Sequence, residues 1–161
     1  RTYIPAVEAG AEDALAQGPL GFRVVDLSVT LTDGKAHSVD SSDFAFRTAG
    51  RMGVKEALSE AGPVLLQPID RVTFHVPSVF SGALVQLVSS LKGQVLGFDA
   101  NPEAPGWDIF NALLPAAAHD DIDRTLGGAT QGTAWYEAEF DHYEELFGKE
   151  AEKVAQARAE A

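Results

Sequence analysis

Residues 71–100 read RVTFHVPSVFSGALVQLVSSLKGQVLGFDA. Apolar residues alternate with polar ones at the start of this stretch: Val72, Phe74 and Val76. This alternation predicts a strand with one buried face and places His75 on the other face. Helical spacing begins after Ser78, which can cap a helix, and Gly93 ends that helix. A second strand is expected over 94–98, so the stretch reads strand, helix, strand.

The same elements return further along the chain. Strands are expected over 107–114 and 133–140, with a weaker helix between them over 116–126. The last strand is expected to bury Tyr136, Ala138 and Phe140. The order strand, helix, strand, strand, helix, strand predicts a ferredoxin-like βαββαβ sandwich over 67–148. A short C-terminal helix is expected over 149–161.

Residues 1–66 have a different pattern. A helix is expected from Pro5, which suits a first turn, to the breakers Gly18 and Pro19. Alternating apolar residues predict a strand over Val24–Leu31. A second helix should start within Asp40–Asp43 and run to about Ala61. It contains Gly50 and Gly53, two residues that suit close packing of another backbone. We expect a partial split β-α-β domain here and a boundary at 62–68, which makes the whole chain α+β.

The composition limits the classes of protein to which the chain can belong. Its 161 residues have a formal net charge of −12 and no cysteine. The charge argues against bulk electrostatic binding of nucleic acid, and the lack of cysteine excludes disulfides and thiolate metal sites. Residues Arg1 to Val7 lack the charged-then-apolar pattern of a signal sequence, and no apolar run is long enough to span a bilayer. No membrane partner is therefore expected, and a cytoplasmic location is the default.

No motif for catalysis stands out. A Walker loop needs Gly-Lys-Ser/Thr, but Gly148-Lys149 is followed by Glu150. His119 precedes three aspartates closely enough to suggest a metal-dependent enzyme, although a solvated acidic helix start explains the same residues better. We therefore assign no catalytic residue, no metal ligand and no cofactor in this chain.

Aromatic residues near Lys92 and Gly93 allow two interpretations. Trp107, Phe110 and Phe98 could stack RNA bases on a sheet, or they could fill the core. The core is favoured because Asp99 and Asp108 would repel a phosphate backbone.

The polar turn after the first expected strand is the most distinctive local feature. It contains Asp33, Gly34, Lys35 and His37. Judged on spacing alone, it is an ordinary exposed turn.

Several segments resemble elongation factor G in the order of its domains IV and V. They are YIPAVE (3–8), the stretch from Gly18 to Gly50 that includes VDSSDFAF, PVLLQPIDRV (63–72), ATQGT (129–133) and FDHYEEL (140–146). The resemblance covers nearly the whole chain, and its domain boundary falls at the one expected above.

This resemblance implies a role at the ribosome. The family's GTPases move tRNA and mRNA, or recycle the ribosome, with the domain IV tip in the decoding site. The tip loop aligns with 33–37, so Asp33, Gly34, Lys35 and His37 become candidate RNA contacts. Domain V is implied to meet ribosomal RNA and protein near the large-subunit GTPase-associated centre. GTP and Mg²⁺ are expected in a G domain outside this chain.

Further basic residues are candidates for facing RNA: Arg47, Arg51, Lys55 and Lys92. An exposed charged helix face explains the first three equally well. The family's paired arginines are replaced by Leu91-Lys92, and its arginine after TQG is Thr133 here. Because these changes remove positive charge, we expect a divergent paralogue of the translocase.

The chain begins inside the domain IV resemblance, so we expect a fragment whose first strand lacks partners. The apolar face of that strand should be short of cover, which favours disorder, contact with a second copy or folding back on domain V. The alternative is a free-standing ferredoxin-like module that binds protein or RNA without any ribosomal role.

Overall fold

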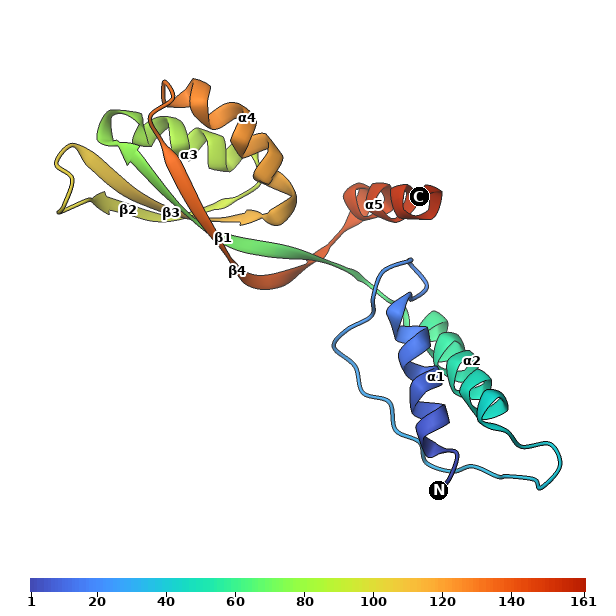
Figure 1. Ribbon diagram of the computed structural model, residues 1–161. Coiled ribbons are helices and arrows are strands. Elements are labelled where there is room, and N and C mark those ends of the chain that lie inside the picture. The colour runs from blue at the N-terminus through green and yellow to red at the C-terminus, as the bar shows by residue number, and fades with distance from the viewer. The chain divides into compact units, whose positions relative to one another are not determined.

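The computed structural model describes residues 1–161, which form two compact units (Figure 1). Unit 1 comprises Arg1–Leu65 together with Leu146–Ala161, and unit 2 comprises Leu66–Glu145. The C-terminal helix therefore groups with the first part of the chain. None of the helices has the length and apolarity needed to cross a membrane.

Unit 2 is a four-stranded antiparallel sheet with the strand order β2-β3-β1-β4. Its elements follow the expected order: β1 (Leu65–Pro77), η1 (Ser78–Phe80), α3 (Ser81–Ser90), β2 (Gln94–Ala100), β3 (Trp107–Pro115), η2 (Ala116–Ala118), α4 (His119–Ala129) and β4 (Trp135–Leu146). Both helices lie over one face of the sheet (Figure 1). This arrangement confirms the ferredoxin-like α+β prediction.

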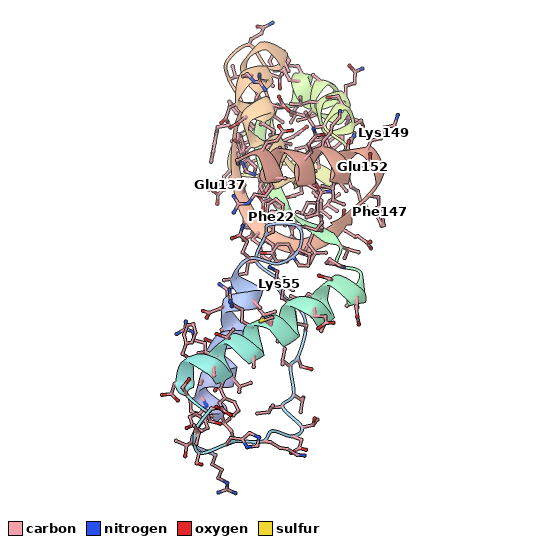
Figure 2. The ribbon with its side chains drawn as sticks, turned by 90° about the vertical axis from the view of Figure 1, so that its right-hand side faces the viewer. Phe22, Lys55, Glu137, Phe147, Lys149 and Glu152 are labelled. Atoms are coloured by element: carbon pink, nitrogen blue, oxygen red, sulfur yellow. The ribbon has the colours of Figure 1, made fainter.

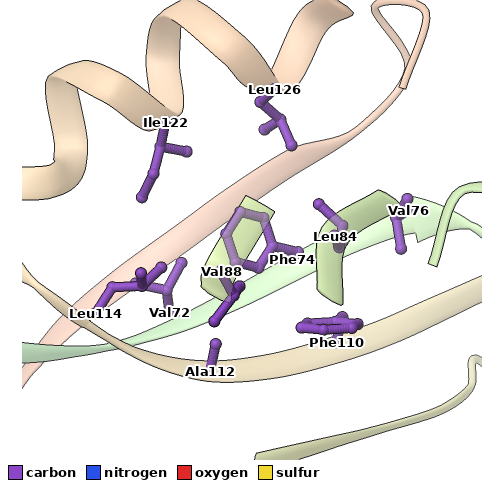
Figure 3. Packing of buried hydrophobic residues seen from close by; sticks show 10 residues of the cluster. All are labelled: Val72, Phe74, Val76, Leu84, Val88, Phe110, Ala112, Leu114, Ile122 and Leu126. Atoms are coloured by element: carbon purple, nitrogen blue, oxygen red, sulfur yellow. The ribbon is translucent and has the colours of Figure 1, made fainter. Parts of the chain in front are cut away.

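The core of unit 2 lies between this face and the two helices (Figure 3). Alternate residues of β1 and β3 face one another in register, as Phe74 does with Phe110. The cluster is entirely apolar: Val72, Phe74, Val76, Leu84, Val88, Phe110, Ala112, Leu114, Ile122 and Leu126. The prediction that these aromatic residues fill the core is confirmed for Phe110. It is wrong for Phe98, which stacks on Phe110 with ring centroids 5.4 Å apart but is 48% exposed.

The expected burial of the last strand is wrong beyond Tyr136. Tyr136 packs against the core, whereas Ala138 is exposed and Phe140 is 56% exposed. The strand continues to Leu146, but the core contains no residue of β4 after Tyr136. Alternation alone therefore overestimated how far the core extends along this strand.

Unit 1 contains α1 (Ile4–Ala16), α2 (Asp43–Ala61) and α5 (Gly148–Glu160). At the start of α2, Ser42 Oγ accepts a hydrogen bond from the Ala45 backbone N–H at 3.1 Å, which satisfies one of the unpaired amides of a helix N-terminus. The helix ends at Gly62, whose φ of 73° favours glycine.

Two glycines allow α1 and α2 to touch through their backbones. A Cβ on Gly10 would lie 1.9 Å from the Arg47 carbonyl oxygen, and one on Gly50 would lie 2.6 Å from the Val7 carbonyl oxygen. The close approach expected at Gly50 is confirmed. It is wrong for Gly53, where an added Cβ would meet nothing within 4 Å.

The strand expected over Val24–Leu31 is not formed. Asp26 has a φ of 63°, which interrupts extended backbone, and no neighbouring strand supplies ladder hydrogen bonds. The expectation that its apolar face lacks cover is confirmed, because four of its side chains are 42–51% exposed: Val25, Leu27, Val29 and Leu31.

The C-terminal helix α5 is attached to the turn that follows α1. Arg158 Nε donates a hydrogen bond to the Gly21 carbonyl oxygen at 2.9 Å. Its guanidinium lies 5.4 Å from the centre of the Phe22 ring, within cation–π range (Phe22 is labelled in Figure 2). One arginine thus joins residues far apart in sequence.

Candidate functional site

The loop at 33–37 connects the segment Val24–Leu31 to the turn that precedes α2. Asp33 Oδ1 accepts a hydrogen bond from the Gly34 N–H at 2.8 Å. The His37 N–H donates to Ser41 Oγ at 2.7 Å, and the Ser41 N–H donates to the His37 carbonyl oxygen at 3.2 Å. The backbone at His37 is thus tied to the turn before α2, while residues 33–37 are all exposed.

An apolar groove of about 580 Å³ lies beside this loop in unit 1. Its floor comes from α1 and α2, including Val7, Phe46 and Gly50, and residues 29–36 form a wall. Three of the four candidate RNA contacts, Asp33, Gly34 and Lys35, therefore border this groove.

Arg47 is engaged within unit 1. Its Nε and a terminal nitrogen lie 2.7 and 2.9 Å from the two carboxylate oxygens of Asp13, in a bidentate pair that joins α2 to α1. The hydrogen bond from Arg47 lowers the pKa of Asp13, and the same bond raises the pKa of Arg47. Arg47 is therefore less suited to binding RNA than the sequence suggested, whereas Arg51 and Lys55 are exposed.

Lys92 belongs to unit 2, whereas the loop and α2 belong to unit 1. It lies in the turn after α3 with a φ of 60°, and its N–H donates to the Ser89 carbonyl oxygen at 3.2 Å. The structure therefore groups the loop with Arg51 and Lys55 in one unit and puts Lys92 in the other.

His119 does not gather the neighbouring aspartates. Its Nε2 lies 2.8 Å from Asp70 Oδ2 on β1, and its ring lies 5.9 Å from that of Tyr136. The Tyr136 hydroxyl donates to Asp123 Oδ1 at 2.7 Å. Burial, followed by this hydrogen bond to a carboxylate, raises the pKa of Tyr136 to about 12. The structure contains no group of three or more histidine, aspartate or glutamate side chains placed to hold a metal ion.

Sequence reasoning missed two polar clusters in unit 2. The buried Asp108 accepts hydrogen bonds from Ser78 Oγ at 2.8 Å and Ser81 Oγ at 2.6 Å, at the start of α3. On the other face of the sheet, the His75 ring stacks on Trp135 with centroids 3.9 Å apart. The outward position of His75 was predicted, but its partner on β4 depends on strand order.

Comparison with known proteins follows the same division of the chain. The family described as "Elongation factor G, domain IV" matches residues 1–62, and "Elongation factor G C-terminus" matches residues 64–154. An elongation factor G-like protein of Synechocystis sp. is 42% identical over 146 residues, which cover 91% of this chain and 22% of that protein.

A crystal structure of a protein from Thermus thermophilus superimposes with a TM-score of 0.88 at 32% sequence identity. The match covers 99% of this chain and 24% of that one, so the chain spans about a quarter or less of the length of these two relatives. Two family models in sequence account for nearly all of the residues. The chain therefore belongs to the elongation factor G family and corresponds to its domain IV and C-terminal regions.

Proposed function

We propose that this chain is the ribosome-binding part of an elongation factor G-like translational GTPase that acts in translocation or a related ribosomal step. The loop at 33–37 contacts tRNA or mRNA at the decoding site, and unit 2 meets the large subunit near its GTPase-associated centre. GTP and Mg²⁺ are bound by another part of the longer protein, which works in the cytoplasm. Membership of the elongation factor G family supports this proposal.

The observation that carries the proposal is the exposed loop with its tied backbone. His37 is held through its own N–H and carbonyl groups, so its imidazole is available to a partner. Lys35 supplies a positive charge within two residues of it. Such groups suit contacts to phosphate and sugar, which position a complex without reading its sequence.

The charge balance supports local contacts over a broad electrostatic surface. The chain has 24 acidic and 12 basic residues, and Arg47 is paired with Asp13. A protein of this charge gains little from long-range attraction to RNA. Placement by the rest of the ribosomal complex would bring the loop to its target.

The test compares His37→Ala with the unmodified full-length protein in single-turnover assays of tRNA movement and of GTP hydrolysis. We expect movement to slow by about tenfold, the scale of one lost charge-assisted contact, and hydrolysis to stay within twofold. Lys153→Ala is the control, because it removes an exposed charged side chain of α5, outside the loop. An equal loss of both rates in His37→Ala would contradict a role for the loop after hydrolysis.

A further inference from the structure

The face of the unit 2 sheet that α3 and α4 leave uncovered has an aromatic and acidic site at the junction of β1 and β4. The His75 ring stacks on Trp135 at an interplanar angle of 14°. His75 Nε2 lies 3.4 Å from Glu137 Oε2. Trp135 and Glu137 are alternate residues of β4, so both side chains lie on the same face as His75.

The three side chains differ in how much they expose. The His75 side chain is only 19% exposed, whereas that of Glu137 is 69% exposed, and Trp135 as a residue is 52% exposed. His75 therefore works as a support that orients the indole, and the indole and carboxylate are presented to a partner. A half-exposed tryptophan in a fixed orientation is a typical energetic anchor of a protein interface.

The charge along β4 indicates the chemistry of that partner. Five acids follow Tyr136 on this strand: Glu137, Glu139, Asp141, Glu144 and Glu145. No lysine or arginine occurs between Arg124 and Lys149, and the one arginine of the neighbouring strand β1 that shares the face of His75 is the exposed Arg71. A phosphate backbone would be repelled here, whereas a cationic side chain would be attracted.

We propose that this site, formed by Trp135, Glu137 and His75, binds an arginine-bearing segment of a partner protein. A guanidinium stacks on the Trp135 ring and donates to the Glu137 carboxylate, which has unused acceptor positions. Arginine suits the site better than lysine, because its planar group can stack and can donate two hydrogen bonds at once. The inference concerns unit 2 alone and does not depend on the role proposed for the loop at 33–37.

The test uses the full chain with three probes: hexa-arginine, hexa-lysine and hexa-uridylate. Binding is followed by NMR chemical-shift changes, with the Trp135 indole N–H as the local reporter. We expect hexa-arginine to shift this resonance and to bind at least threefold more tightly than hexa-lysine. Trp135→Ala lacks the indole reporter and is followed through the backbone amide shifts of β1 and β4; it should weaken binding about tenfold. Glu137→Gln should weaken binding about fivefold.

A matched control separates the site from general attraction between a basic peptide and an acidic protein. Glu152→Gln on α5 of unit 1 removes the same charge elsewhere and should change the affinity less than twofold (Glu137 and Glu152 are labelled in Figure 2). Glu137→Gln changes an exposed side chain, so it keeps the test valid if Trp135→Ala disturbs the sheet. Equal effects of the two glutamate changes, or tighter binding of hexa-uridylate at this face, would overturn the proposal.

Discussion

Replacing Gly10 by alanine is a direct test of how α1 and α2 pack. The new Cβ would lie 1.9 Å from the Arg47 carbonyl oxygen and 2.9 Å from the Arg51 backbone nitrogen. Both atoms belong to the α2 backbone, which cannot turn aside as a side chain can. The helices would have to separate by roughly 1.5 Å to bring this Cβ to an ordinary contact distance of 3.4 Å, because well-packed interiors leave no room for an added methyl group.

Two opposing terms set the size of the effect. Alanine in place of glycine favours a helix by about 1 kcal/mol. Overpacking costs about 1–3 kcal/mol, and loss of the exposed Asp13–Arg47 pair that bridges the helices would add a smaller cost. We therefore expect the free energy of opening the helix pair to fall by about 1–2 kcal/mol, which corresponds to roughly 5–30-fold faster amide exchange.

Hydrogen exchange by mass spectrometry, on peptides that cover α1 and α2 in the full chain, measures this local stability. Gly53→Ala is the matched control, because an added Cβ there meets nothing within 4 Å. That change should slow exchange up to about fivefold, since only the helix propensity term remains. Exchange in Gly10→Ala that is as slow as in Gly53→Ala would refute the backbone contact between the helices.

Three further changes test unit 2 and the end of β4. Asp108→Ala removes the acceptor of two serine hydroxyls and should lower the stability of unit 2 by about 1–3 kcal/mol in denaturant unfolding. Tyr136 should titrate near pH 12 by NMR, and Asp123→Asn should lower this pKa. The stability that the raised pKa contributes should be present below about pH 10 and be lost as the pH rises towards 12. The carboxylates of Glu144 and Asp141 raise the pKa of His142 in the folded protein. Protonated His142 therefore stabilises the fold at pH values below the pKa that this residue has in the unfolded chain, and the contribution is lost as the pH rises through the pKa of the folded state. Glu144→Gln should lower that pKa in an NMR titration, and an unchanged value would contradict the contact.

The fold of unit 2 could be predicted because its pattern of alternating and helically spaced apolar residues depends on residues that are close together in the sequence. Alternation at Val72, Phe74 and Val76 determines which side chains share a face, whatever packs against them. Helix signals such as Pro5 and Gly18 work in the same way, because they act on the backbone within one turn of the helix end. The loop at 33–37 was chosen as a candidate site from its composition and from the family resemblance.

Contacts between distant segments could not be read from the pattern. The Arg47–Asp13 pair joins residues 34 positions apart, and it exists only because glycines let the two helices touch. The strand expected at Val24–Leu31 shows the converse, because an alternating segment becomes a strand only where a neighbour pairs with its backbone.

The amino-acid sequence by itself determined the class of each α-helix and strand that the structure contains, the face on which its apolar residues lie and the family to which the chain belongs, although it also predicted a strand over Val24–Leu31 that is not formed. Only the tertiary structure decided how far along β4 the core extends, which charges are paired, and that Trp135 meets His75. The physical reason is the distance along the sequence over which each kind of interaction acts. Propensity, capping and alternation act within a few residues, whereas burial and pairing depend on partners supplied by other elements after they have packed.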